Sequence, residues 1–249
     1  MATIYDVAKV AGVSPKTVSR VLNRDAPVSK ATRDAVEAAI AQLGYVPSNA
    51  ARTMRSSKTG LIGLISGAIS EAETSPEQSG LPEIYIFQGV QKVLRDAGKT
   101  LLIADTGGDE ANIPTLMRTF AEHRVEGLVY VAPYHQHVVL PKPPGSEALV
   151  IANGFDAEGT PCVVPDDYAG QKALTERLIE IGHRRIAYLT LPEGLVATRE
   201  RLQGFIDAHT EAGLEVDPRL IRPADTMSPS PDDRRSTLKF ALDSVLALP

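Results

Sequence analysis

The segment VSPKTVSRVLN, residues 13–23, places basic and hydroxyl side chains on one face of a short helical pattern. Its apolar residues recur at helical spacing and form an inner stripe of Val18, Val21 and Leu22. The residues left on the outside are Pro15, Lys16, Thr17, Ser19, Arg20 and Asn23. Lysine and arginine can donate hydrogen bonds to guanine O6 and N7, while threonine, serine and asparagine can hold phosphates. Recognition of double-stranded DNA is the chemistry that this pattern could perform.

Two further helical patterns flank this segment. Thr3 followed by Asp6 is a capping-box pattern that opens a first helix, which Gly12 ends. Its apolar residues are Ile4, Val7, Ala8 and Ala11. Ser14 can cap the second helix and Ser29 a third, which Gly44 ends. The inner stripe of the third helix is expected to be Ala35, Val36, Ala39, Ile40 and Leu43.

Two short helices joined by a tight Gly-Val-Ser turn, with a third helix packed across them, predict a helix-turn-helix unit. In such a unit the second helix enters the major groove by its N-terminal end. The helical pattern alone leaves open a three-helix packing module that does not contact DNA.

Charge is distributed unevenly along the chain, whose formal net charge is −5. Residues 1–60 hold nine Lys and Arg against four Asp and Glu, and the remaining residues hold 17 against 27. A basic head on an acidic body is typical of a polyanion-binding module attached to a body that does not bind polyanions. An unevenly charged, solvated surface is the alternative.

Length and composition limit the class of protein. With 249 residues, of which 43% are apolar, the chain can bury a core in one large domain or two modest ones. Its single cysteine, Cys162, cannot form an internal disulfide and fits a reducing cytosol. The sequence contains neither a run of about 18 apolar residues nor the apolar segment of a signal peptide. We therefore expect a soluble, cytoplasmic protein.

Beyond Gly60, short apolar runs alternate with amphipathic helical patterns. Strands are expected at residues 61–65, 100–105, 125–132, 148–153 and 184–190. Helices are expected at residues 87–98, 113–124, 169–182 and 198–213. This alternation predicts a doubly wound parallel sheet with helices on both faces, whose ligands bind beyond the carboxyl ends of the strands.

Catalytic motifs are not recognisable in this body. The sequence lacks both G-x-G-x-x-G after the first strand and G-x-x-x-x-G-K-[ST]. Its histidines form no i, i+4 metal-binding pair, and we expect His135 and His137 to be solvated. The adjacent Asp166 and Asp167 are expected to cap a helix at a strand-to-helix turn. We therefore expect neither an enzyme nor a metal or cofactor site.

The amino-acid sequence of residues 3–52 is similar to that of a known DNA-binding domain. TIYDVAKVAGVSPKTVSRVLN, followed by VSKATRDAVEAAIAQLGYVPSNAART, closely resembles the headpiece of the LacI/GalR family of bacterial transcription factors. The resemblance implies that bases are read by Pro15, Lys16 and Arg20. It implies that the DNA backbone is contacted by Ser14, Thr17, Ser19, Asn23, Ser29 and Thr32. Because Pro15 offers only apolar contact, Lys16 and Arg20 would carry more of the readout.

The segment SNAARTMRSSKTG, which begins at Ser48, is basic and free of acidic residues. By itself it has the composition of a flexible linker. In the resembled family this segment folds into a hinge helix on DNA and inserts a paired apolar side chain into the minor groove. The resemblance assigns that role to Met54, where the family usually has leucine, with Arg52 and Arg55 beside it.

The body resembles the periplasmic-binding-protein-like core of the same family in RVEGLVYVAP, VVPDDYAGQKALTERLIEIGHRRIAYL and RERLQGF. The resemblance implies that Arg201, from an R-x-x-G-aromatic motif, binds a small effector in the cleft between two subdomains, with Asp166 as a cleft-facing acid. Spacing alone would equally allow Arg201 to be a surface residue of a helix. The GHRR stretch, residues 182–185, is interpreted as a helix stop and strand start.

Two features depart from the family pattern. The segment of residues 66–87 is longer and richer in serine, glutamate and proline than the family's loop, so ligand contacts cannot be assigned to it. The chain ends at LDSVLALP, where the family continues with more strands of the second subdomain. We therefore expect a C-terminally truncated family member whose second core subdomain is incomplete.

The predicted fold is a small all-α helix-turn-helix headpiece joined to an α/β periplasmic-binding-protein-like core. We expect a headpiece at residues 1–46, a basic hinge at 47–59, a first core subdomain at 60–160 and a partial second one at 161–249. The predicted protein is a homodimeric or higher-oligomeric repressor of the bacterial cytoplasm, associated with the nucleoid. It would bind a palindromic operator under the control of a small molecule such as a sugar or related metabolite. The alternative is a cytosolic solute-binding module with a vestigial headpiece.

Overall fold

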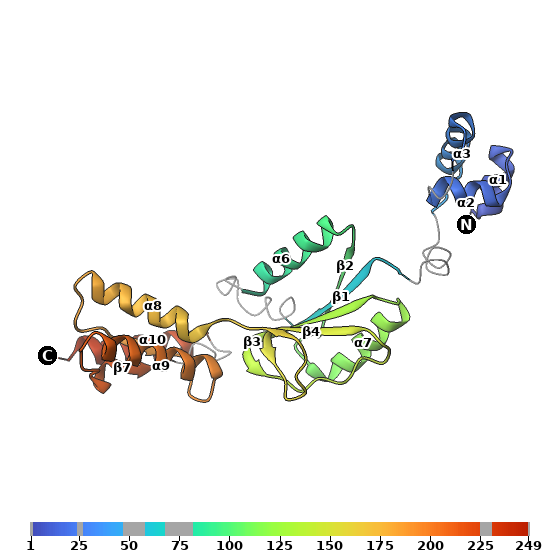
Figure 1. The fold of residues 1–249 in the computed structure, drawn as a ribbon. Coiled ribbons are helices and arrows are strands. Elements are labelled where there is room, and N and C mark those ends of the chain that lie inside the picture. The colour runs from blue at the N-terminus through green and yellow to red at the C-terminus, as the bar shows by residue number, and fades with distance from the viewer. Residues whose placement is uncertain (1, 24–26, 47–57, 68–81, 225–230, 249) are drawn as a thin grey trace. The chain divides into compact units, whose positions relative to one another are not determined.

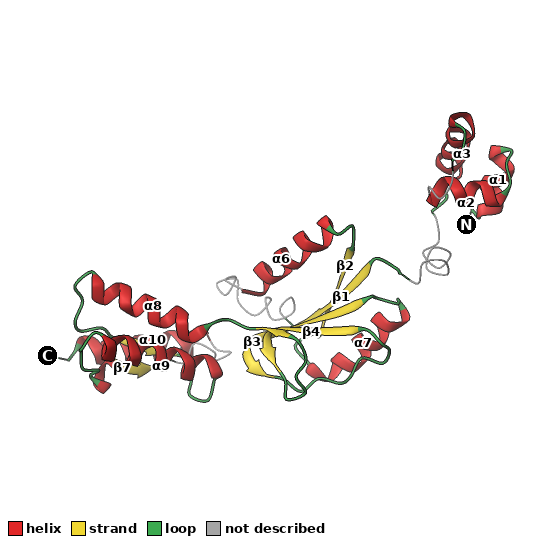
Figure 2. Ribbon diagram, in the orientation of Figure 1, coloured by secondary structure: helices red, strands yellow, loops and turns green. Residues whose placement is uncertain are grey.

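A computed structural model of the chain describes residues 2–23, 27–46, 58–67, 82–224 and 231–248 (Figure 1). Residues 1–59 and residues 60–249 form two compact units. The first unit is helical in its described part, and the second combines helices with parallel strands (Figure 2). None of the described helices has the length and apolar character that crossing a membrane requires.

The first unit contains the three predicted helices: α1 (Ile4–Ala11), α2 (Pro15–Asn23) and α3 (Lys30–Leu43). Its core consists of Val7, Ala8, Val18, Val36 and Ala39. The expectation that Ala35 belongs to the inner stripe is wrong, because this residue is exposed one position before the buried Val36. The stripe of α3 is therefore narrower than its apolar composition suggests.

Local hydrogen bonds define the ends of these helices as predicted. Thr3 and Asp6 form a complete capping box: the amide and hydroxyl of Thr3 donate to Asp6 Oδ2 at 2.8 and 2.7 Å. These hydrogen bonds from Thr3 lower the pKa of the Asp6 carboxyl below its ordinary value. Gly12 and Gly44 adopt the left-handed conformation that closes α1 and α3. The tight turn into α2 follows directly from the first of these two stops.

The second unit begins with a five-stranded parallel sheet in the order β2-β1-β3-β4-β5. The strands are β1 (Leu61–Ser66), β2 (Thr100–Asp105), β3 (Gly127–His137), β4 (Ala148–Phe155) and β5 (Cys162–Val163). Helices α6 (Pro82–Asp96) and α7 (Ile113–Glu122, after a short 3₁₀ turn η3, Glu110–Asn112) lie on opposite sides of the sheet (Figure 1). The core between sheet and α7 includes Ile65, Met117, Phe120, Leu128 and Ile151. This is the parallel, helix-covered sheet expected from the alternating pattern.

The rest of the unit is built around a two-stranded parallel sheet of β6 (Tyr188–Thr190) and β7 (Ile221–Pro223). Its helices are α8 (Asp167–Glu180), α9 (Val196–Glu211) and α10 (Pro231–Leu246), with a 3₁₀ turn η4 (Pro218–Leu220) before β7. Phe205 of α9 is 2% exposed and stacks on Tyr188 of β6, with ring centroids 5.1 Å apart. This aromatic pair ties α9 to the small sheet.

Three of the predicted elements have a boundary that differs from the sequence prediction by more than two residues. Helix α6 begins at Pro82 instead of residue 87, since a proline followed by Glu83 suits the first turn of a helix. Strand β3 continues past residue 132 to His137, because a register shift between Val131 and Gln136 accommodates the intervening proline. Strand β6 begins only at Tyr188, not at residue 184. Because α6 begins at Pro82, the long loop expected at residues 66–87 is shorter than predicted, and its residues 68–81 lie outside the described residues.

Candidate DNA interface and effector cavity

Helix α2 presents its basic side chains at the surface of the first unit. Its N-terminus is closed by Ser14, whose Oγ accepts a hydrogen bond from the amide of Thr17 at 3.1 Å. Lys16 and Arg20 are both exposed, and their i, i+4 spacing puts them on one face of the helix. Neither charged group forms an ion pair or hydrogen bond with another described residue of the headpiece. Both are free to donate to an external acceptor.

The other predicted DNA-contacting side chains lie around the ends of α2 and α3. The hydroxyl groups of Ser14 and Thr17 are 2.9 Å apart, and those of Ser29 and Thr32 are 2.8 Å apart. The Asn23 amide donates to the carbonyl and hydroxyl oxygens of Ser19 at 2.9 and 3.2 Å. These groups therefore combine helix capping with positions from which hydroxyls and free helix N–H groups can reach phosphate.

Pro15 is the first residue of α2 and is half-buried, so only part of its ring faces outward. The predicted hinge residues Arg52, Met54 and Arg55 lie outside the described residues. Within the described residues, the candidate interface is therefore the exposed face of α2 together with the N-terminus of α3.

Arg201 of α9 is at the centre of a polar cluster in the second unit. Its Nε donates to Asp167 Oδ1 at 2.6 Å, and the second oxygen of Asp167 lies 2.7 Å from Nδ1 of His135. The Asp167 side chain is only 3% exposed and that of His135 10%, whereas that of Arg201 is 40% exposed. The carboxylate thus joins β3, α8 and α9 and leaves the guanidinium partly open.

Two adjoining cavities open beside this cluster. The first, of about 210 Å³, is lined by Pro133, Tyr134, His135, Asn153, Pro165, Asp167, Leu191, Leu195, Ala197 and Arg201. The second, of about 420 Å³, shares His135, Pro165 and Asp167 with the first and also contacts Asp166, Arg199 and Glu200. Their walls come from the carboxyl ends of β3 and β4 and the N-terminal turns of α8 and α9. This is where a parallel α/β fold places its ligands.

The two residues expected to bind an effector, Asp166 and Arg201, therefore line neighbouring cavities without contacting each other. Asp166 is the N-cap of α8, and its Oδ1 accepts from the amide of Ala169 at 2.9 Å. The acid that pairs with Arg201 is Asp167, which was expected from sequence only to cap a helix. The expectation of a solvated His135 is wrong, because β3 extends far enough to carry its ring onto Asp167.

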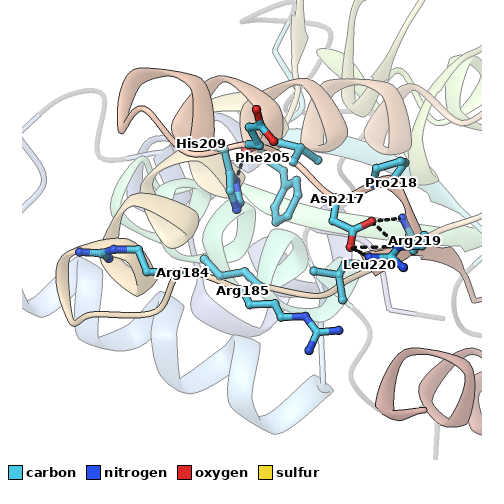
Figure 3. Close-up of a pocket in the computed structure, with 11 residues that line it drawn as sticks. Arg184, Arg185, Phe205, His209, Asp217, Pro218, Arg219 and Leu220 are labelled. Carbon is cyan, nitrogen blue, oxygen red and sulfur yellow. Dashed lines mark hydrogen bonds and ion pairs between the residues drawn. The ribbon is translucent and has the colours of Figure 1, made fainter. Parts of the chain in front are cut away.

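A larger cavity of about 540 Å³ lies between α9 and the segment that leads into β7 (Figure 3). Arg219 donates through Nε and Nη2 to Asp217, and this hydrogen bonding lowers the pKa of the Asp217 carboxyl. His209 donates from Nδ1 to the carbonyl of Phe205 at 2.9 Å. Arg184 donates to the carbonyls of Ile179 and His183, which supports the interpretation of GHRR as a helix stop. In the described residues this cavity shares no lining residue with the Arg201 cluster.

These features define a protein with a helix-turn-helix module and a parallel α/β core that carries a ligand-sized cavity. Comparison with known families agrees with both parts. Residues 3–48 match the family described as "Bacterial regulatory proteins, lacI family", and residues 84–238 match "Periplasmic binding proteins and sugar binding domain of LacI family". The chain belongs to the LacI family, which confirms the predicted fold class.

Named relatives are transcription regulators. The chain is 32% identical over its whole length to the HTH-type transcriptional repressor PurR of Aliivibrio fischeri, of which it spans 75%. Over 87% of its length it is 34% identical to the ribose operon repressor of Escherichia coli K12, and over 88% it is 36% identical to the regulator CelR of Thermobifida fusca. It spans 64% of each of these two relatives.

Solved structures give the same result. The Lac repressor bound to ONPG in its repressed state matches 90% of the chain with a TM-score of 0.68 and 26% identity, and the match covers 66% of that structure. A CelR–cellobiose complex matches the whole chain with a TM-score of 0.53 and 30% identity, and the match covers 72% of that structure. The first is a repressor bound to ONPG, and the second is a transcriptional regulator bound to cellobiose.

Proposed function

We propose that this protein is a sequence-specific DNA-binding transcriptional repressor rather than an enzyme. The observation that carries the proposal is the exposed face of α2, on which Lys16 and Arg20 stand side by side without partners among the described residues. Guanine O6 and N7 are the acceptors that such side chains read in the major groove. The repressor names of its relatives support the same function.

Within the headpiece we assign base reading to Pro15, Lys16 and Arg20. Backbone contacts are assigned to Ser14, Thr17, Ser19, Asn23, Ser29 and Thr32. Arg52, Met54 and Arg55 are proposed to act at the minor groove as a hinge. We retain the domain limits 1–46, 47–59, 60–160 and 161–249. A headpiece that reads one half-site fits a homodimer on a palindromic operator in the bacterial cytoplasm.

We further propose that a small molecule bound beside Arg201 controls operator affinity, without a metal or other cofactor. The cavities lie where three elements meet, so a ligand there would contact β3, α8 and α9 together. A ligand that favours one arrangement of these elements changes DNA affinity by linkage. The names of the ribose operon repressor and of the CelR–cellobiose complex favour a sugar or a related metabolite.

The DNA-binding proposal is tested by selecting binding sites from random duplexes with the full chain and its variants. Lys16→Ala and Arg20→Ala should each lose about 1–3 kcal/mol of binding free energy at particular base pairs. Arg52→Ala should weaken binding to all sequences and flatten the dependence on salt. Lys9→Ala is the matched control, since Lys9 is an exposed lysine at the end of α1.

Selected sequences that are unchanged by Lys16→Ala and Arg20→Ala would refute the assignment of base reading. A gel shift against random DNA at two salt concentrations tests the function more broadly. If the chain does not shift DNA in the gel even at low salt, it does not bind DNA, and a solute-binding module with a vestigial headpiece becomes the better description.

A further inference from the structure

We infer that Asp167 is a specificity determinant of the cavity beside Arg201: by neutralising the guanidinium, it excludes anionic ligands and selects uncharged polyhydroxyl ones. This role for Asp167 rests on the proposed function, because it specifies the class of effector. From sequence, Asp167 was expected only to cap a helix.

The charges around the cavity are balanced or slightly negative. Apart from His135, which lies against Asp167, the only formally charged side chains among the described residues that line the smaller cavity are Arg201 and Asp167. The adjoining cavity adds Asp166 and the ion pair between Arg199 and Glu200, whose charged atoms are 3.3 Å apart. A phosphate or carboxylate entering this region meets no uncompensated positive charge. Anion binding would therefore lack its usual electrostatic support.

Two contacts hold the Asp167 carboxylate in its ion pair with Arg201. One of its oxygens accepts from Arg201 and the other lies 2.7 Å from His135 Nδ1, and the side chain is 3% exposed. An anion that captured Arg201 would leave this carboxylate buried with only the histidine, which is energetically unfavourable. Displacement of Asp167 by an incoming anion is thus opposed by both of its contacts.

The same pairing orients Arg201 as a hydrogen-bond donor. Because the carboxylate engages Nε, the two terminal nitrogens of the guanidinium are left for a ligand, and the side chain is 40% exposed. Parallel donors of this kind suit vicinal hydroxyl oxygens as well as anions. Charge compensation by Asp167 is what distinguishes between the two.

The remaining walls fit an uncharged polar ligand of small size. Asn153 has a left-handed backbone with φ of 61° and donates from Nδ2 to the carbonyl of Ala132 at 3.0 Å, so its amide is fixed at the cavity wall. Tyr134 adds a hydroxyl, while Leu191 and Leu195 add apolar surface. A volume of about 210 Å³ is below the range of about 300–1,000 Å³ found for drug-sized ligands. A small ligand with several hydroxyl groups fits such walls.

The test compares neutral and anionic probes on the full chain by titration calorimetry at constant ionic strength. The neutral probes are a panel of mono- and disaccharides that includes ribose, sucrose and cellobiose, and the anionic probes are ribose 5-phosphate and inorganic phosphate. For the wild-type chain we expect at least one neutral sugar to bind tenfold or more tightly than either anion. This comparison needs no variant, so it holds even if substitutions impair folding.

Asp167→Asn provides a gain-of-function readout that a purely structural role would not produce. Removing the carboxylate charge should raise affinity for inorganic phosphate about tenfold or more, and Arg201→Met in the same chain should abolish the gain. Asp166→Asn is the matched control: it removes the same charge one residue away, at a carboxylate that caps α8 and does not contact Arg201.

Two outcomes would overturn the role of Asp167. One is a wild-type chain that binds ribose 5-phosphate or phosphate at least as tightly as every neutral sugar of the panel. The other is a phosphate affinity that rises equally in Asp167→Asn and Asp166→Asn. Operator binding, measured in parallel by gel shift, separates the two proposals: its loss would refute the repressor function but not the sugar selectivity.

Discussion

The close packing of α8 against α9 gives a sharp prediction for Gly204. A Cβ atom added at this position would lie 2.4 Å from the carbonyl oxygen of Tyr168 and 3.0 Å from the amide nitrogen of Lys172. Both atoms belong to the backbone of α8, so they cannot rotate away as the end of a side chain would. Restoring an ordinary contact of about 3.4 Å requires the two helices to separate by roughly 1 Å.

The expected magnitude for Gly204→Ala follows from two opposing terms. Overpacking a well-filled contact typically costs about 1–3 kcal/mol, and a clash between two backbones belongs at the upper end of that range. Alanine recovers up to about 1 kcal/mol through its higher helix propensity. The net loss in free energy of unfolding should be about 2 kcal/mol. For a unit of this size that corresponds to a decrease in Tm of about 4–8 °C.

Gly170→Ala is the matched control, because Gly170 also lies in a helix, α8, but a Cβ there would meet nothing within 4 Å. This substitution should stabilise the unit by about 0.5–1 kcal/mol. Thermal unfolding of the full chain measures both variants, and hydrogen exchange of peptides from α8 and α9 locates the change. If the two variants shift Tm in the same direction, the account of helix packing through Gly204 is wrong.

Two further predictions concern single side chains. Because hydrogen bonds from Thr3 lower the pKa of Asp6, the ionised carboxylate stabilises α1 at neutral pH. This stabilisation is lost as the pH falls through the lowered pKa. In a pH titration of the α1 amide NMR signals, Asp6→Asn should therefore reduce the change in these signals at acidic pH. Phe205→Ala should destabilise the second unit by about 3–5 kcal/mol in urea unfolding, because the ring is 2% exposed and stacked on Tyr188. A loss below 1 kcal/mol would contradict its core role.

The headpiece could be predicted from sequence in most of its detail because its determinants are local. Thr3 and Asp6 satisfy each other three residues apart, and Gly12 takes the left-handed conformation that only a residue without Cβ adopts easily. The one error, Ala35, has a physical cause. Alanine is compatible with both faces of a helix, so its position in an apolar stripe is decided by the packing of neighbouring helices.

The core could be predicted in its topology but not in its boundaries. Alternating strands and helices predict a parallel sheet, yet the point at which β3 ends depends on pairing with β4 beyond an intervening proline. The role of the glycine in the R-x-x-G motif also depends on a neighbouring helix. Sequence shows Gly204 inside a helix, where it is unfavourable by propensity, and only the approach of α8 explains why no side chain fits there.

The cavity beside Arg201 shows how sequence can point to the region of a candidate site while the contact at its centre is missed. Asp166 and Asp167 are adjacent, and nothing in the dipeptide says which acid caps the helix and which turns inward. The capping residue lies outside the helix and folds its carboxylate back onto the first turn, whereas the next residue projects from the helix side. A helix start shifted by one residue would exchange the two roles.

That choice depends on partners that are remote in the chain. Arg201 lies 34 residues after Asp167 and His135 lies 32 residues before it, and together they occupy both oxygens of its carboxylate. Long-range pairing therefore accounts for which of two identical side chains becomes buried. It also explains why equal charge changes at Asp166 and Asp167 should have unequal effects: only the inner carboxylate compensates the guanidinium that faces the cavity.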